Sequence, residues 1–259
     1  MNPRPALAAY VRHVRLTYPQ HEPQAYVRLP DGEVELVVQL SEDSVAAHAI
    51  GTRLAPLRKT GHTPREALAV RFKAGGAYPF FGLPVSELTD RVLSMETLWG
   101  AESRQLTEAL RGAHSSDARV AAIEQALSAR LQGAALYEPS SAGAARRAIR
   151  LVQQSRVLPN VEELADQLGA SARQLRRAFA AVVGLSPKEY LRVLRFQRAL
   201  QTARRQPHLP WGVIANQAGF YDQAHLVAEF QALGGASPGA LLPGTRRQTA
   251  HRTDLAPAI

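Results

Sequence analysis

The stretch Ser171-Ala-Arg-Gln-Leu-Arg-Arg-Ala-Phe-Ala-Ala-Val-Val-Gly-Leu-Ser-Pro187 decides the fold, because its pattern returns 51 residues further on, from Asp222 to Pro238. Each copy begins with a residue that caps helix N-termini well, Ser or Asp. A Leu four residues later and a Phe eight residues later share one face of the helix that follows. A Gly then ends this helix, and a Ser-Pro pair starts the next one.

A shorter matched pair precedes each copy and completes the motif. Ala165-x3-Gly169 stands before the first copy, and Ala215-x3-Gly219 stands before the second. A short helix, a tight turn at Gly and a capped second helix together form a helix-turn-helix. Between the copies, a helical pattern from Pro187 to Arg205 predicts a spacer about 28 Å long. The two second helices could therefore enter successive major grooves, about 34 Å apart.

The net charge of +9 is distributed unevenly along the 259 residues. Residues 1–144 hold 15 Lys and Arg and 15 Asp and Glu, whereas residues 145–259 hold 16 Lys and Arg against 7 Asp and Glu. A neutral half joined to a basic half indicates one part that senses or assembles and another that meets a polyanion. Genome base composition could explain the preference for Arg over Lys, but it does not explain the asymmetry.

The residues before the motifs predict an α+β fold, with a small β-rich domain and a pair of helices ahead of an all-α domain. Short apolar runs separated by turn residues predict strands at 26–29, 33–40, 45–50 and 67–72. From Val85 the period becomes helical, and residues 102–110 and 117–131 form the predicted amphipathic pair. We predict a regulatory, effector or dimerisation domain at 1–137, a linker at 138–143, a double helix-turn-helix domain at 144–243 and a disordered tail at 244–259.

The side chains for nucleic-acid contact are those of the second helices that packing does not use. A single Arg on a helix usually lies on a solvated face, but three Arg within five residues of a motif helix favour a role in binding. Arg suits bidentate bonding to guanine, and Gln can address adenine. A helix N-terminus can also meet a phosphate. The predicted DNA-binding residues are Ser171, Arg173, Gln174, Arg176, Arg177, Asp222, Gln223 and His225.

These features resemble the AraC-type (AraC/XylS) transcription regulators of bacteria. The pattern Leu175-x3-Phe179-x4-Gly184-x-Ser-Pro187 and the residues Ala218-Gly-Phe220 carry the resemblance, which covers roughly residues 145–243. It implies a seven-helix domain with two helix-turn-helix motifs. The base-reading positions that it implies are Arg173, Arg176, Arg177, Gln223, Ala224 and Ala228.

The chain departs from the family's pattern in its second motif. Two of the implied base-reading positions there are alanines, and Pro238-Gly-Ala-Leu-Leu242 stands where the family usually has an aromatic–Arg pair. We therefore expect the first motif to carry more of the specificity, and the second to act largely through phosphate contacts and helix placement. The N-terminal half resembles the short β-rich regulatory domains attached to some of these regulators, which implies effector sensing or dimerisation.

The sequence thus predicts a sequence-specific DNA-binding transcription regulator that is not an enzyme, with no cofactor and no metal site. Double-stranded DNA is the expected partner, and RNA polymerase, a small-molecule effector and a second copy of the chain are further candidates. The absence of cysteine excludes thiolate chemistry, and the sequence contains no phosphate loop. Without a signal peptide or a spanning apolar run, we expect a cytoplasmic location and no membrane partner. An enzyme delivered to DNA by its basic domain and an architectural nucleic-acid-binding protein stay open as alternatives.

Overall fold

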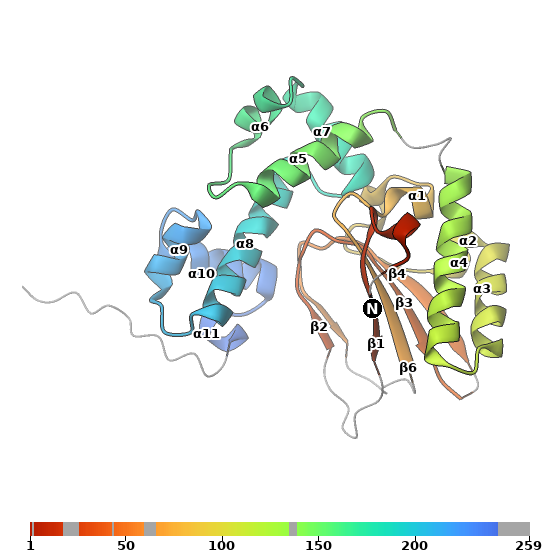
Figure 1. Cartoon of the computed structure of the whole chain (residues 1–259). Helices are drawn as coiled ribbons and strands as arrows, with labels where there is room; N and C mark the ends of the chain where they lie inside the picture. Colours follow the sequence, from red (N-terminus) through yellow and green to blue (C-terminus); the bar gives the residue numbers. More distant parts are fainter. Residues whose placement is uncertain (2, 18–25, 43, 60–65, 135–138, 243–259) are drawn as a thin grey trace, which may run out of the picture.

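The protein has a β-rich N-terminal domain and a helical C-terminal domain, which lie against each other along helix α8 (Pro187–Arg205) (Figure 1). The computed structural model describes residues 1, 3–17, 26–42, 44–59, 66–134 and 139–242. The predicted tail at 244–259 and residue 138 of the predicted linker lie outside the described residues. The α+β fold class predicted from the sequence is confirmed.

The N-terminal domain contains an antiparallel sheet with strand order β1-β6-β3-β4-β7, and β2 pairs with β5 in a separate two-stranded ribbon. The strands are β1 (Val11–Thr17), β2 (Tyr26–Arg28), β3 (Glu35–Leu40), β4 (Val45–Ile50), β5 (Leu57–Lys59), β6 (Glu66–Phe72) and β7 (Val92–Ser94). The interpretation of residues 85–131 as wholly helical was wrong at β7. Three residues are too few to show a period, and this strand exists because it pairs with the edge of β4.

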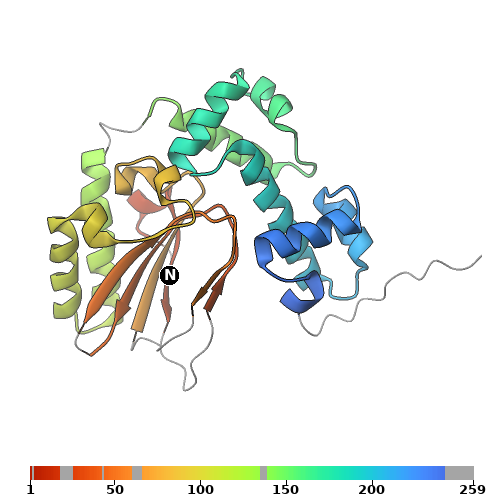
Figure 2. The ribbon, with the colours of Figure 1, turned by 180° about the vertical axis from the view of Figure 1, so that it is seen from behind.

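Helices cover one face of this sheet. The helices of this domain are η1 (Pro5–Leu7), α1 (Tyr78–Phe81), η2 (Val85–Leu88), α2 (Met95–Trp99), α3 (Ala101–Gly112) and α4 (Ser116–Ala134). The predicted amphipathic pair corresponds to α3 and α4, which lie side by side along the sheet in both views (Figures 1 and 2). Alternate residues of β3, such as Leu36 and Val38, share one fully buried core with Leu110 and Ile123 of the two helices. The alternating apolar residues of the strand and the apolar face of each helix are therefore buried against each other in one interface.

The C-terminal domain contains seven helices within the described residues. They are α5 (Ala142–Gln154), α6 (Val161–Gln167), α7 (Ala172–Val182), α8 (Pro187–Arg205), α9 (Trp211–Ala218), α10 (Gln223–Gly234) and α11 (Pro238–Leu241). Helix α5 begins at Ala142, two residues inside the predicted linker, because the Ala142 amide donates to the Pro139 carbonyl oxygen (2.8 Å) and starts the first turn. None of the helices that the structure describes is long and apolar enough to cross a membrane.

Helix α8 holds a helix-turn-helix at each end, α6–α7 on one side and α9–α10 on the other (Figure 1). At the first motif, the rings of Phe179 and Tyr190 meet edge to face at 5.7 Å. At the second, Phe196 and Phe230 do the same at 4.9 Å. The repeated Phe of each motif is thus fully buried against the spacer, as the shared helix face predicted.

Candidate nucleic-acid interface

The outer face of α7 carries the free cations of the first motif. Leu175 and Phe179 are fully buried, so the opposite side of the helix faces away from the core. Arg173, Arg176 and Arg177 are all exposed, and no hydrogen bond or ion pair joins any of the three to a residue that the structure describes. The guanidinium groups are therefore available for an anionic partner.

Two of the predicted contact residues in the first motif have a local role instead. Ser171 and Gln174 form a capping box, in which the Gln174 amide donates to Ser171 Oγ (3.2 Å) and the Ser171 amide donates to Gln174 Oε1 (2.9 Å). These bonds satisfy two of the unpaired N–H groups at the start of α7. Gln174 thus holds the N-terminus of the helix in place, and its amide oxygen is occupied.

The predicted polar residues of the second motif are also largely engaged. Asp222 Oδ1 accepts from the His225 amide (2.7 Å) and caps α10. The His225 ring stands edge-on to Phe220, with ring centroids 5.4 Å apart and planes at 89°. Gln223 is exposed, and its Oε1 lies over α9, 3.7 Å from where a Cβ would stand on Gly212. The side chains of Asp222, Gln223 and His225 therefore lie around the turn between α9 and α10.

One exposed aromatic residue at the second motif was not predicted. Tyr221 precedes the N-cap of α10 and is 93% exposed. A large ring at that exposure is unusual for a residue with only a structural role, because most aromatic residues bury much of their surface. The sequence signal for this residue is its position directly before Asp222, the residue that caps α10.

Comparison with known proteins agrees with this geometry. Residues 164–243 match the helix-turn-helix domain family, and residues 1–94 match a domain of unknown function (DUF6597). The C-terminal domain is an AraC-type helix-turn-helix domain. A relative from Escherichia coli (strain K12), the uncharacterized HTH-type transcriptional regulator YidL, is 32% identical over 98 residues, or 38% of this chain. The matched stretch is 32% of the length of that relative.

Solved structures of ToxT from Vibrio cholerae are also similar over most of the chain. A 1.65 Å structure is 12% identical with a TM-score of 0.44, covering 90% of this chain and 99% of that one. A structure of ToxT with an unsaturated fatty acid bound is 10% identical with a TM-score of 0.44, covering 90% of this chain and 94% of that one. At these identities and TM-scores the likeness carries no inference about function.

The N-terminal domain contacts the first motif of the AraC-type domain through the segment 52–58, which leads from β4 into β5. Thr52 is buried, and its Oγ1 lies 3.2 Å from Thr89 Oγ1. Thr89 Oγ1 in turn donates a 2.6 Å hydrogen bond to the carbonyl oxygen of Gly184, the residue that ends the first repeat's helix. The two threonines therefore attach the end of α7 to the N-terminal domain.

The other end of the same segment reaches the second motif. Pro56 lies against Gly235, where an added Cβ would stand 3.0 Å from Pro56 Cγ. Gly235 is the repeat equivalent of Gly184, and both have a left-handed backbone, with φ of +69° and +85°. The segment 52–58 thus touches the same point of both copies, and Figure 2 shows the β2–β5 ribbon standing between the sheet and the helical domain.

Two further contacts hold the domains together. Gln197 Nε2 on α8 donates to the Pro30 carbonyl oxygen (2.5 Å). Arg146 Nε on α5 donates to the Gly75 carbonyl oxygen (3.0 Å), and its guanidinium lies 5.2 Å from the centroid of the Tyr10 ring. Arg146 of α5 therefore belongs to the domain interface.

Tyr190 of α8 is buried where the domains meet. Its hydroxyl oxygen accepts from Gln153 Nε2 (3.1 Å). Burial raises the pKa of Tyr190 to about 12, because the charged phenolate would lose its hydration. Burial also raises the pKa of the nearby Glu33 carboxyl, against the lowering effect of its ion pair with Arg12. The interface therefore favours the neutral phenol.

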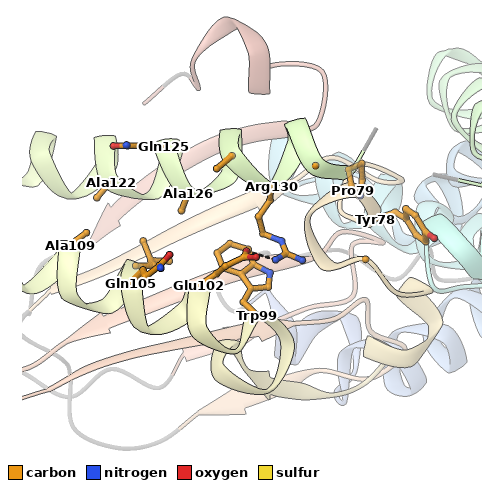
Figure 3. A pocket seen from close by; sticks show the side chains of 14 residues that line it. Tyr78, Pro79, Trp99, Glu102, Gln105, Ala109, Ala122, Gln125, Ala126 and Arg130 are labelled. Atoms are coloured by element: carbon orange, nitrogen blue, oxygen red, sulfur yellow. Dashed lines mark hydrogen bonds and ion pairs between the residues drawn. The ribbon is translucent and has the colours of Figure 1, made fainter. Parts of the chain in front are cut away.

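A groove of about 810 Å³ lies between α3 and α4, on the far side of the N-terminal domain from α8 (Figures 1 and 3). Figure 3 shows alanine and glutamine side chains of the two helices along its walls, together with Trp99, Glu102 and Arg130. At one end Arg130 donates to the Phe80 carbonyl oxygen (2.7 Å), pairs with Glu102 and lies 5.0 Å from the centroid of the Trp99 ring. The charged groups of the groove thus bind each other, and it offers mainly apolar contact.

The described part of the chain contains no group of three or more His, Cys, Asp or Glu placed to hold a metal ion.

Proposed function

We propose that this protein is a sequence-specific transcription regulator that binds double-stranded DNA with both helix-turn-helix motifs of its AraC-type domain. The observation that carries the proposal is the outer face of α7, where Arg173, Arg176 and Arg177 stand clear of the core without partners among the described residues. Arg grips guanine bidentately in the major groove and also neutralises phosphates. Similarity to an HTH-type transcriptional regulator supports the same function.

The spacing of the motifs supports reading of two major grooves by one chain. Helix α8 has 19 residues and is therefore about 28 Å long. Buried aromatic pairs join α7 to Tyr190 near the start of this helix and α10 to Phe196 at its middle. Successive major grooves on one side of DNA lie about 34 Å apart, a distance that α7 and α10 could span together.

The N-terminal domain, in this proposal, modulates binding by setting where the two motifs stand. Thr52 and Pro56 of the segment 52–58 lie against Gly184 and Gly235, so a displacement of the segment would move the ends of α7 and α10 together. A small-molecule effector or a second copy of the chain could supply that displacement, and RNA polymerase is the partner through which a bound regulator would act.

A selection of duplexes from a random library with the purified full-length protein tests the function. We expect a bipartite sequence whose half-sites lie about 10–10.5 base pairs apart, centre to centre. Arg173→Ala should lose discrimination in one half-site, whereas Arg111→Ala, which removes an exposed Arg from α3, should leave the selected sequence unchanged. Absence of any enriched sequence, or an identical sequence for Arg173→Ala, would overturn the proposal.

A further inference from the structure

The outward face of α10 is made of methyl groups. Leu226 and Phe230 are fully buried, so the side of the helix directly opposite them points away from the core. Ala224 and Ala228 are exposed on that opposite side, and Gln231 follows one turn later. In the first motif, the positions of Ala224 and Ala228 hold long cationic side chains.

The polar neighbours of these alanines are turned to other tasks. The His225 ring packs edge-on against Phe220, and Asp222 caps the helix. Glu229 Oε2 accepts from Arg192 Nε of α8 (2.5 Å) and fixes α10 to the spacer. The centre of the outward face is therefore left without a charged group of its own.

The second motif also lacks cations altogether. Residues 206–243 contain no Lys or Arg, and Asp222 and Glu229 give them a net charge of −2 with His neutral. Residues 145–205 hold 13 Lys and Arg against 4 Asp and Glu. Among the described residues of the C-terminal domain, the Lys and Arg that could bind phosphates therefore all precede residue 206. Phosphate contacts of the second motif would therefore come from neutral polar side chains and from the N-terminus of α10, without Lys or Arg.

We propose that α10 recognises its half-site through the methyl groups of thymine, an inference that rests on the proposed function. Thymine C5-methyl is the methyl group that unmodified DNA presents in the major groove, where sequence is otherwise read mainly from hydrogen-bond donors and acceptors. An alanine Cβ can contact that methyl but cannot address a donor or acceptor. Because Ala224 and Ala228 are short, the helix can approach the base edges closely.

The two half-sites of the operator should therefore differ in chemistry. Arg173 and Arg177 of α7 are the repeat equivalents of Ala224 and Ala228, and their guanidinium groups match guanine. The first half-site is read by hydrogen bonds and held by charge, whereas the second is read by apolar contact. The operator is a guanine-containing half-site joined to a thymine-containing one.

Replacing single thymines of the selected operator by uracil tests the inference, because this change removes one methyl group and preserves base pairing. Full-length protein should lose about fourfold in affinity for each contacted thymine of the second half-site, the equivalent of about 0.8 kcal/mol per buried methyl. Uracil in the first half-site is the matched control and should leave the affinity unchanged. The variant Ala228→Arg should shift the selected base in the second half-site from thymine to guanine, as in the first motif.

The outcomes separate the inference from the function on which it rests. A bipartite operator that tolerates uracil at every thymine of its second half-site overturns the inference and leaves DNA-binding function intact. Enrichment of a single half-site, unaffected by Ala228→Arg, also overturns it and makes α10 a surface for a protein partner. A library without any enriched sequence removes the proposed function and the inference together.

Discussion

The attachment of the first motif to the N-terminal domain can be tested by adding one methyl group, in Gly184→Ala. The left-handed backbone at Gly184 (φ +85°) costs about 1–2 kcal/mol for any residue with a Cβ. The added Cβ would also stand 2.7 Å from Thr52 Oγ1 and 2.8 Å from both Thr89 Oγ1 and the Val85 carbonyl oxygen. A backbone oxygen cannot rotate away, so the two domains must shift apart locally.

That shift gives the expected magnitude. It weakens the hydrogen bond from Thr89 to the Gly184 carbonyl oxygen, and such a bond contributes about 0.5–1.5 kcal/mol. Together with the backbone strain, we expect Gly184→Ala to lower the free energy of unfolding by about 1.5–3.5 kcal/mol. Gly235→Ala is the matched control, since it has the same strain but meets only the edge of the Pro56 ring, at 3.0 Å. Its expected cost is about 1–2 kcal/mol.

Urea denaturation of both variants measures the difference directly. A second comparison uses the fragment 139–259, which lacks the N-terminal domain and keeps the Pro139 carbonyl oxygen that starts α5. In this fragment the two substitutions should cost the same, because only backbone strain is left. Equal losses for Gly184→Ala and Gly235→Ala in the full-length chain would refute the reasoning, and so would an unequal loss that persists in the fragment.

Three further predictions concern single side chains. Burial in the folded state raises the pKa of Tyr190 from 10.0 to about 12, so the stability that depends on its neutral form is fully present below pH 10. About 2–3 kcal/mol of the free energy of unfolding should be lost between pH 10 and 12. Tyr190→Phe should flatten the profile of stability against pH in this range, and an unchanged profile would contradict the prediction. Arg173→Ala should weaken operator binding by about 1–3 kcal/mol in a fluorescence titration, and Gln223→Ala should weaken it less; the reverse order would contradict the assignment of the first motif as the stronger reader. Arg198 donates to three carbonyl oxygens at the end of α5. Arg198→Met should therefore lower the free energy of unfolding by at least about 1.5 kcal/mol, with a matching drop in melting temperature. A wild-type melting curve would show that these bonds contribute little.

The C-terminal domain was predictable because its signals are local and occur twice. Caps and closing glycines at fixed distances specify where α7 and α10 begin and end, and the Leu and Phe positions specify their buried face. Phe179 and Phe230 are fully buried as expected. The predicted contact residues Arg173, Arg176 and Arg177 lie together on the outer face of α7, and their role in DNA binding stays a prediction.

The contacts between domains were not predictable from the sequence, because each joins residues far apart in the chain. Nothing in the sequence around Pro30 or Gly75 indicates that their carbonyl oxygens accept from Gln197 and Arg146. Strand β7 was missed for the same reason, since three residues acquire strand geometry only through a neighbour. Periodicity shows which face a segment buries but does not identify the segment that covers it.

The charge distribution and the domain contacts have one consequence when they are considered together. A motif without Lys or Arg gains little from the electrostatic attraction that brings a protein to DNA. Apolar contact with a base edge also acts only at short range, so α10 must already stand at the correct height over its groove when α7 binds. The Glu229–Arg192 pair fixes α10 to α8, and Pro56 limits it from the N-terminal side at Gly235. A displacement of the segment 52–58 should therefore alter recognition of the thymine half-site more than that of the guanine half-site, because cations can hold α7 on the DNA backbone through small shifts and alanines cannot.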